Sequence, residues 1–533
     1  MMKQTVLNML VLLQVLRQAT EVTAHKCNHG KHKDHKPPQP LDDTPETRSR
    51  LLEVGGSTNY LSWHQMRIFM DWTPVAKYNT ANPARFAQTQ LMVRVVHGAT
   101  SYFETILQVE YYTQMNLLGG PCASTELDPI NLPSDLYIVV NTAPSDSAQY
   151  ITRSVACFYS KKDGRPLVAS LFLNPSFMNT APSQELKVYF SVLHEMVHML
   201  GFDNDLFGNF KVPGTTTNRP LTEVIQNCTL GVTTYQCVIL PEVVTWARNH
   251  FGCEILSGVP LENYGGFSVA GHHWESTFFF SELMAPSVDS QSFLSGLTHA
   301  FLRGTGWYNV LEGSDQVFEW SAKIGCSCYD LTCPAIPEQF CSPTAASSNI
   351  CGPNFYAKGS CIKLSELESA RDCRVLVAND DSCYETDYST LSNETFGATS
   401  RCLNTKKQNF ARAQCYKSTC LSSGTVVITV GTKNFSCTST GQQITVAVGE
   451  VVTCPNIVKL CNQLRNSCPQ DCNRRGYCAR DKTCYCLGGW SGLSCGSSSY
   501  IDYAKLLIHE TKRKSFLFGC VKILLILLII PLS

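Results

Sequence analysis

The chain has 533 residues, of which 44% are hydrophobic and 16% are charged. This composition supplies enough apolar material for a buried core, predicts about two to four structural units and excludes an intrinsically disordered chain. Lysine plus arginine and aspartate plus glutamate number 43 each, so the formal net charge is zero. A neutral chain is unlike proteins that work mainly by gripping nucleic acid, and no nucleic-acid partner is expected.

The first 24 residues have the layout of a secretory signal peptide. Lys3 precedes the apolar stretch 6–16, and the small residues at 22–24 suit a cleavage site. The apolar stretch is too short to span a bilayer comfortably; the alternative is a buried N-terminal helix. Residues 1–24 are therefore predicted to direct the chain into the secretory pathway.

Cysteines are numerous and unevenly spread along the chain. Of the 27 cysteines, six precede residue 300 and 21 lie between Cys326 and Cys520. Such a density is typical of chains that form disulfides in an oxidising compartment. Three N-x-S/T sequons, at Asn227, Asn393 and Asn434, agree with export.

The segment after the signal, 25–38, is polar, basic and proline-ended, and is predicted to be extended. Strand-like runs follow at 66–70, 91–96 and 136–140, where β-branched, aromatic and other apolar residues dominate. Between the last two runs, apolar residues at helical spacing predict a helix over 101–118. Strands that alternate with a helix indicate a mixed sheet with a covering helix.

The strongest helix prediction covers 183–200. This segment begins with a suitable serine N-cap, carries recurring apolar residues and is followed by Gly201 as a suitable stop. After a connection of about seventy residues, another amphipathic helix is expected over 292–301. Beyond Cys326 the chain becomes cysteine-rich, with short strand-like runs such as 424–430.

The first of these helices contains His194-Glu195-Met196-Val197-His198, which follows the H-E-x-x-H pattern. Positions i and i+4 of a helix lie one above the other, so both histidines can face one metal ion. Two neutral imidazoles suit Zn²⁺, and Glu195 can act as general base towards a water that the metal activates. The alternative is a surface helix whose histidines face solvent, which the apolar neighbours disfavour.

Gly201 extends the pattern, because a glycine three residues after the second histidine lets the chain leave the helix and turn sharply. The metzincin form of the motif requires such a glycine. Most metzincins place a third histidine a few residues further on, but residues 203–207 contain none.

Two later segments, 271–275 and 281–286, read G-H-H-W-E and S-E-L-M-A-P. Together with residues 194–202 they resemble leishmanolysin, a family of surface metalloproteases. In that family an insertion separates the glycine from a third zinc ligand in an H-W-E context, and an E-L-M-A-P segment supplies the methionine of the Met-turn. The resemblance implies one Zn²⁺ bound by His194, His198 and His273, with Glu195 as catalytic base and Met284 beneath the metal.

His272 is adjacent to the implied third ligand and competes with it for that role. The family pattern places the ligand directly before tryptophan, which favours His273. For Met284 the alternative is an ordinary buried methionine that fills a gap in the core.

Cys27 resembles the propeptide cysteine of the same family, which is thought to hold the zymogen inactive. A thiolate is a strong zinc ligand and can occupy the position that a water needs. Two alternatives remain: a disulfide, or a weak metal-binding tract made by the histidines between residues 25 and 35. The propeptide is predicted to end before Trp63, near residues 47–50.

The six cysteines from Cys468 to Cys495 include a closely spaced C-x-C and end in a glycine-aromatic stretch. They resemble an EGF-like module, and the resemblance supplies the usual disulfide pairing. The module is interpreted either as a rigid spacer between protease and membrane, which is favoured, or as an adhesive or substrate-recruiting unit.

At the C-terminal end, the basic residues 512–514 precede a hydrophobic stretch at 516–530. Such a tail is either the signal for a glycolipid anchor or a terminal membrane helix. Small residues at 496–499 suit an attachment site, although the spacer is long and Lys522 interrupts the tail. The chain is predicted to reach the cell surface and to be held at the membrane through this tail.

The resemblance implies an α+β fold with a metzincin-like catalytic domain and a zinc-dependent endopeptidase, made as a zymogen, that cleaves protein or peptide substrates outside the cell. The alternative is a surface adhesion or binding protein with a vestigial or structural zinc site, although the intact Glu195 favours activity. The predicted divisions are a signal peptide (1–24), a propeptide (25–60), an N-terminal catalytic subdomain (61–202), a central insertion (203–270), a C-terminal subdomain with the third ligand and Met-turn (271–460), an EGF-like module (461–496), and a linker with the anchor tail (497–533).

Overall fold

The computed structural model describes most of the chain from Trp63 to Ser498, and three short stretches before it, at 25–26, 38–41 and 43–45. Between 63 and 498 it leaves out 111–112, 118–120, 123–124, 127–129, 145–147, 149, 180–181, 216, 231–232, 265–268, 327–338, 342–347, 364–373, 385–393 and 409. The predicted signal peptide, Cys27, the predicted end of the propeptide and the C-terminal tail lie outside the described residues. Within the described part, no helix is long and apolar enough to cross a bilayer.

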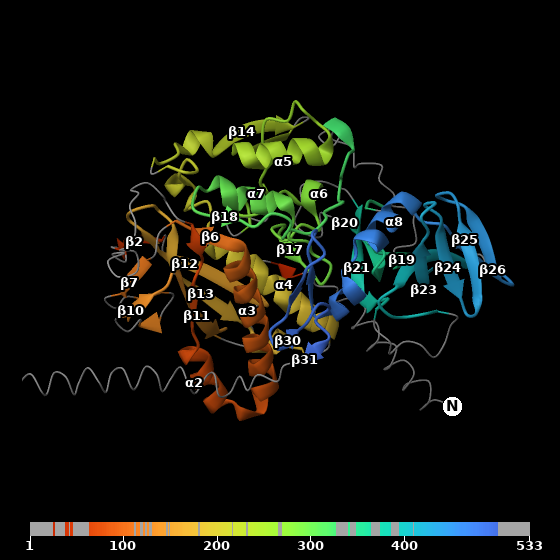
Figure 1. The fold of residues 1–533 in the computed structure, drawn as a ribbon, viewed down its shortest axis with the longest axis horizontal. Coiled ribbons are helices and arrows are strands. Elements are labelled where there is room, and N and C mark those ends of the chain that lie inside the picture. Colours follow the sequence, from red (N-terminus) through yellow and green to blue (C-terminus); the bar gives the residue numbers. More distant parts are fainter. Residues whose placement is uncertain are drawn as a thin grey trace, which may run out of the picture.

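A five-stranded sheet forms the centre of the first half of the chain, with the strand order β2-β12-β13-β11-β5 (Figure 1). Its inner strands, β11 (Leu136–Thr142) and β13 (Pro166–Leu173), consist mainly of apolar residues and are buried. Such runs suit strands that are covered on both faces. β5 (Ile68–Asp71), β11 and β13 are mutually parallel, β12 (Thr152–Ser160) is antiparallel to β13, and β2 (Gln39–Leu41) pairs with β12.

Two long helices pack beside this sheet. α4 (Pro182–Met199) lies against β12, and α3 (Phe86–Ile106) lies beside α4 (Figure 1). α4 agrees with the helix predicted over 183–200, with the apolar residues of its predicted buried side in the core. This helix therefore packs against both the sheet and α3, and it carries the H-E-x-x-H sequence.

The strand predicted over 91–96 is wrong, because these residues lie inside α3. Met92, Val93, Val95 and Val96 are all at most 1% exposed, so the helix is apolar around most of its circumference here. A short, fully apolar run does not distinguish a strand from a buried helix by its periodicity.

The helix predicted over 101–118 also differs from the structure. The helical part ends at Ile106, and the chain continues directly as strand β6 (Leu107–Val109). Residues 113–117 form another strand, β7. The first part of the apolar spacing thus runs from the buried end of α3 into the buried start of β6.

The inserted segment after α4 folds onto the same core. It contains the hairpin β14 (Ile225–Leu230) and β15 (Thr233–Val238) and the helix α5 (Pro241–Phe251), which packs against α7 (Gly296–Gly304). α7 begins a few residues later than predicted, where the Ser295 side chain accepts a hydrogen bond from the Leu297 amide and caps the helix. Disulfides join Cys228 to Cys237 and Cys253 to Cys326.

A second, smaller core lies in the cysteine-rich part of the chain. A six-stranded antiparallel sheet with the order β25-β24-β23-β22-β27-β26 packs against α8 (Ile457–Asn466) (Figure 1). β24 (Val426–Val430) corresponds to the strand predicted at 424–430. α8 crosses the predicted domain boundary at 460, and the disulfide between Cys420 and Cys461 ties it to the sheet.

The strands of this sheet are β22 (Ser400–Lys407), β23 (Phe410–Cys420), β24, β25 (Lys433–Cys437), β26 (Gln443–Ala447) and β27 (Glu450–Thr453). A neighbouring three-stranded sheet consists of β19 (Ser348–Cys351), β20 (Ala357–Lys363) and β21 (Arg374–Ser382). Disulfides Cys341–Cys361, Cys351–Cys402, Cys383–Cys415 and Cys437–Cys454 connect this part of the chain.

The shorter elements complete the described chain. They are β4 (His64–Gln65), α2 (Thr73–Ala81), β8 (Pro121–Cys122), β9 (Thr125–Glu126), β10 (Ile130–Pro133), β16 (Val259–Pro260), α6 (Ser276–Phe279), β17 (Ser287–Val288), β18 (Asn309–Val310), β28 (Gly476–Cys478), β29 (Cys484–Cys486), β30 (Trp490–Ser491) and β31 (Ser497–Ser498).

The six-cysteine module is packed against the main apolar core of the molecule. Tyr477, Ala479 and Leu487 belong to the main apolar core, and the ribbon of the module lies beside α3 and α4 (Figure 1). The Gly488 amide donates to the Arg94 carbonyl of α3. A spacer between a protease and a membrane is expected to have few contacts with the main core. The contacts of this module therefore do not fit the favoured interpretation as a spacer.

A buried polar cluster fixes the module in place. The Tyr102 hydroxyl of α3 lies 3.0 Å from both the Tyr477 hydroxyl and Nε2 of His299 on α7. Tyr477 also donates to the Ser314 carbonyl. All four residues are buried, so each of these polar groups depends on the others for a partner.

The described strands before Trp63 pair with strands that follow Trp63. β1 (His25–Lys26) pairs with β17, β2 pairs with the edge of β12, and β3 (Asp43–Pro45) pairs with β7. The described parts of the predicted propeptide thus pair with three separate strands, β17, β12 and β7.

Candidate metal centre

Two histidines near the C-terminal end of α4 point their rings toward each other. His194 and His198 are one helical turn apart, both are at most 1% exposed, and their Nε2 atoms are 3.0 Å apart. The burial excludes the alternative of a surface helix whose histidines face solvent. Since apolar residues of α4 fill the core on its other sides, the two imidazoles and Glu195 account for the polar character of this turn.

Gly201 lies where the chain leaves α4, as the sequence predicts. Its φ angle is +128°, a conformation that side chains rarely adopt, and an added Cβ would lie 2.8 Å from the ring of Trp307. The turn brings the Phe202 carbonyl back to the helix, where it accepts a hydrogen bond from Nδ1 of His198 at 2.7 Å. The glycine therefore also positions the second histidine.

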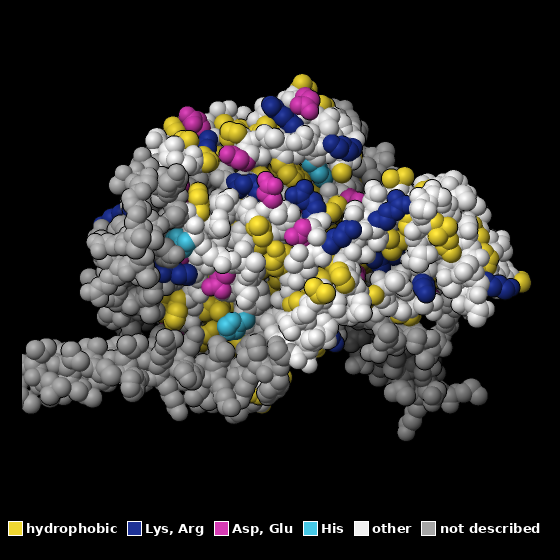
Figure 2. All heavy atoms as spheres, viewed as in Figure 1, with side chains coloured by type: hydrophobic (Ala, Val, Ile, Leu, Met, Phe, Trp, Pro, Cys, Tyr) yellow, Lys and Arg dark blue, Asp and Glu magenta, His cyan; other side chains and the backbone are white. Residues whose placement is uncertain are grey.

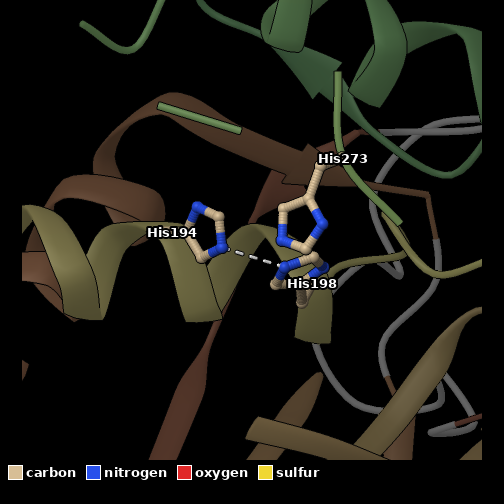
Figure 3. Close-up of side chains that lie close together, drawn as sticks. All are labelled: His194, His198 and His273. Atoms are coloured by element: carbon tan, nitrogen blue, oxygen red, sulfur yellow. Dashed lines mark hydrogen bonds between the residues drawn. The ribbon is translucent and has the colours of Figure 1, made fainter. Parts of the chain in front are cut away.

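His273 joins the other two histidines from a segment that follows the insertion. Its ring centroid lies 5.3 Å from that of His194 and 5.1 Å from that of His198, and one nitrogen of each ring lies within 4.8 Å of a nitrogen of each of the other two (Figure 3). Two backbone pairings hold the segment: Leu261 bridges Trp274, and the Glu262 amide donates to the His273 carbonyl at 2.8 Å.

His272 takes a different place. Its Nδ1 lies 3.5 Å from Oδ1 of Asp203, just beyond the helix exit, and it is outside the cluster of three rings. The structure thus brings together the histidine that precedes tryptophan, in agreement with the sequence prediction, and uses its neighbour to join the ligand segment to the end of α4.

Each of the three imidazoles is oriented by a backbone carbonyl. Nδ1 lies 2.6 Å from the Leu283 carbonyl in His194, 2.7 Å from the Phe202 carbonyl in His198 and 3.0 Å from the Val269 carbonyl in His273. A carbonyl only accepts, so Nδ1 carries the proton and Nε2 keeps the lone pair that binds a metal. Three buried neutral imidazoles that converge through Nε2 fit Zn²⁺ with a fourth position for a reactant.

Glu195 is completely buried and has a partner that sequence reasoning missed. The Ser154 hydroxyl of β12 lies 2.8 Å from Oε2 of Glu195 and 3.1 Å from its carbonyl oxygen. No motif in the sequence marks Ser154, because the link depends on how β12 packs against α4. This hydrogen bond fixes the orientation of the carboxylate next to the cluster of three histidines.

Met284 is buried in the main core, and the backbone of its turn contacts the segments that carry His194 and His273. Its carbonyl accepts a hydrogen bond from the Trp274 amide at 2.9 Å, directly after His273. The preceding carbonyl, of Leu283, orients His194. The predicted Met-turn thus connects His194 with the segment that carries His273.

Glu282 anchors this turn from inside. Its carboxylate accepts hydrogen bonds from the Met284 amide at 2.5 Å, from the Ser295 hydroxyl at 2.8 Å and from the Thr298 hydroxyl at 2.7 Å. Burial raises the pKa of Glu282 to about 7, against the opposing effect of these donors. The sequence segment that contains Glu282 signalled the Met-turn, but not the anchoring role of this side chain.

Comparison with known proteins agrees with this arrangement. Residues 130–370, which include all three histidines and the Met-turn, match the family model described as Leishmanolysin. This part of the chain is similar to the leishmanolysin family.

Individual relatives are distant but consistent. The chain is 27% identical over 220 residues to a leishmanolysin-like peptidase of Caenorhabditis briggsae, a match that covers 36% of this chain and 33% of the relative. It is 24% identical over 250 residues to leishmanolysin of Leishmania chagasi, covering 45% of this chain and 39% of the relative. It is 28% identical over 137 residues to a leishmanolysin homolog of Crithidia fasciculata, covering 26% and 19%. The chain spans about a third of the length of the first two relatives.

Proposed function

We propose that the protein is a zinc-dependent endopeptidase that hydrolyses internal peptide bonds of protein or peptide substrates. The observation that carries this proposal is the convergence of three buried imidazoles, each oriented by a carbonyl, beside the buried carboxylate of Glu195. Two of the proposed metal ligands, His194 and His198, and the proposed general base Glu195 lie within about one turn of α4, an arrangement that supports metal-assisted hydrolysis.

The residues divide the chemistry between them. His194, His198 and His273 would hold the ion, which when bound supplies a Lewis acid for the peptide carbonyl and for water. Glu195 accepts a proton from the attacking water and later gives it to the leaving amine. Ser154 holds one oxygen of that carboxylate and so keeps the base oriented through both transfers.

A Glu195→Gln variant tests the base directly. We expect casein hydrolysis to be lost while bound zinc is retained, because the amide cannot accept the proton from water. Glu185→Gln is the matched control: it makes the same change on α4, where Glu185 pairs with Arg94 at 3.0 Å. A zinc chelator should abolish the activity of the wild type and of the control. Casein hydrolysis by Glu195→Gln would contradict the mechanism.

The ligand set is tested by metal analysis of purified variants. His273→Ala should reduce bound zinc well below one ion per chain, whereas His272→Ala should keep it. A structural zinc site, as in an adhesion or binding protein, normally has four protein ligands, but the cluster of described residues offers three. Retention of zinc together with complete inactivity of the mature wild type would favour the binding alternative.

We also propose that Cys27 keeps the enzyme latent by binding the metal. The strand β1 supports this proposal: His25 pairs with Val288 and Lys26 with Ser287, a few residues after Met284, and Cys27 follows immediately in sequence. Full-length Cys27→Ser should hydrolyse casein without proteolytic processing, whereas the full-length wild type should need processing. Equal latency of the two chains would overturn the proposal.

The proposed location is outside the cell, at its surface. Ten disulfides between described residues support passage through an oxidising compartment. Two of the three sequon asparagines, Asn227 and Asn434, lie exposed on the surface. Mass spectrometry of the mature termini would identify the signal cleavage site and distinguish a glycolipid anchor from a terminal helix.

The EGF-like assignment is a further proposal for residues 468–495. Disulfides join the first cysteine to the third, the second to the fourth and the fifth to the sixth: Cys468–Cys478, Cys472–Cys484 and Cys486–Cys495. This pairing, with the hairpin β28–β29, supports the assignment. The packing of Tyr477 and Leu487 into the main core supports a role in holding the catalytic half together.

A further inference from the structure

Two neighbouring turns form the outer end of the six-stranded sheet. Lys407 pairs with both Phe410 and Glu450, and Ala447 pairs with Glu450, so the β22–β23 and β26–β27 turns lie side by side. The Gln408 amide joins them by donating to the Gly449 carbonyl at 2.9 Å. We call residues 406–412 and 447–450 the sheet tip, with residue 409 outside the described chain.

The sheet tip exposes two large apolar side chains. Phe410 is 71% exposed and is the most exposed aromatic residue of the described chain, while Val448 is fully exposed. Val448 occupies a two-residue hairpin turn, where asparagine, aspartate and glycine are favoured. The turn itself therefore gives no reason for a valine, and neither side chain packs against the core beneath it.

Basic side chains surround these two residues. Lys406, Lys407 and Arg412 are exposed, and Figure 2 shows basic and hydrophobic side chains together at the outer end of this sheet. In the sequence of the two hairpins, 400–417 and 440–453, Glu450 is the sole acid. Its carboxylate is 2% exposed, accepts from the Tyr416 hydroxyl at 2.8 Å and lies 3.8 Å from Nζ of Lys407, so little negative charge reaches the surface.

We propose that the sheet tip docks on a membrane surface that contains anionic lipid. Apolar side chains at the apex, with cations around them, match the layered chemistry of such a surface, in which acyl chains lie beneath anionic headgroups. A soluble polyanion would use the cations and leave Phe410 and Val448 without a role. This contact is separate from the predicted C-terminal tail and would set the orientation of a protease held at a membrane.

Hydrogen exchange of the full chain tests the contact at the tip itself, independently of the tail. Vesicles of phosphatidylcholine with 30% phosphatidylserine should slow amide exchange in peptides that cover 400–413 and 443–452, whereas phosphatidylcholine vesicles alone should not. Lys406→Glu combined with Arg412→Glu should raise the vesicle concentration for half-maximal protection more than about 25-fold, because each cation at an anionic surface contributes about a factor of five. This pair leaves Lys407 next to Glu450.

A further double variant separates the apolar from the charged contribution to membrane binding. Phe410→Ala combined with Val448→Ala should weaken protection by about ten-fold or more through lost apolar burial. The matched controls are Lys161→Glu with Lys162→Glu, an exposed basic pair after β12, and Ile255→Ala, an 83% exposed aliphatic residue. Both controls should stay within about two-fold of wild type.

Two results would overturn the proposal. One is unchanged exchange at the sheet tip with phosphatidylserine vesicles. The other is equal protection by soluble heparin that the Phe410 and Val448 substitutions leave unaltered, because this would assign the tip to polyanion binding and not to a membrane.

Discussion

Ser154 gives the clearest new handle on the chemistry. Ser154→Ala should lower kcat for peptide hydrolysis about ten-fold or more, since a hydrogen bond to a charged group contributes about 1.5–3 kcal/mol. KM and bound zinc should stay near the wild-type values, because the Ser154 hydroxyl makes its hydrogen bonds to Glu195 and not to the three histidines. Steady-state kinetics on a fluorogenic peptide, with zinc measured on the same samples, provide the test.

Two variants decide whether that effect is local. Ser154→Thr keeps the hydroxyl and should recover part of kcat. Ser191→Ala removes another buried hydroxyl, from α4, that donates to the Lys187 carbonyl at 3.0 Å, and it should leave kcat unchanged. An equal loss in both alanine variants would indicate general loosening of α4.

Single residues differ in how far sequence predicted them. His194, Glu195 and His198 follow from helical geometry, because an i, i+4 pair must share a face. His273 required the resemblance, since no spacing rule bridges a long insertion. Ser154 and Glu282 act through contacts between segments far apart in sequence, and nothing in their own neighbourhoods predicts those contacts.

At the scale of an element, α7 carries a pH-sensitive contact through His299. Burial, together with the positive charges of Arg303 and Arg480, lowers the pKa of His299 to about 3. An unfolded histidine titrates near 6.5, so between pH 3 and 6.5 the unfolded chain binds a proton that the folded chain does not. The stability from this group is complete above pH 6.5 and falls as the pH drops, by about 2 kcal/mol at pH 5.

A His299→Gln variant isolates this contribution. Urea unfolding at pH 7.5 and at pH 5 should show a difference in unfolding free energy that is about 2 kcal/mol smaller in the variant than in the wild type. The amide can still meet the Tyr102 hydroxyl but does not titrate. An unchanged pH dependence would mean that His299 is not the group responsible.

The elements also show where local pattern fails. The sequence predicts α4 well, because it has a clear start, a glycine exit and an apolar side. It fails at α3, whose residues 91–96 are buried on most sides and therefore lose the periodicity that marks a surface helix. The central strands β11 and β13 have the same property. Because both are almost fully buried, they lack the alternation of apolar and polar residues that marks a half-buried strand.

For the molecule as a whole, the close packing of the six-cysteine module on α3 is expected to contribute to the free energy of unfolding. Gly98 lies inside α3, and an added Cβ would lie 2.8 Å from the Gly488 amide nitrogen and 3.1 Å from Cα of Leu487. Helix propensity alone would make Gly98→Ala stabilising by about 1 kcal/mol. The clash is with backbone held by disulfides, so we expect net destabilisation of about 1–3 kcal/mol.

Thermal unfolding of Gly98→Ala, followed by near-ultraviolet circular dichroism, measures this sign. Gly208→Ala is the control, because nothing lies within 4 Å of its added Cβ. A melting temperature for Gly98→Ala at or above that of the wild type would show that the module does not bear on α3.

The position of the module has a consequence for biosynthesis. Tyr477 and Leu487 complete a core that begins near Met66, so the first half of the chain must wait for roughly 400 further residues to be translated, about 20–80 s at 5–20 residues per second. During that interval the nascent chain carries α4 without the last part of the core around it. Completion of the main core is thereby coupled to the end of synthesis, and a chain that stops short of residue 487 should be degraded.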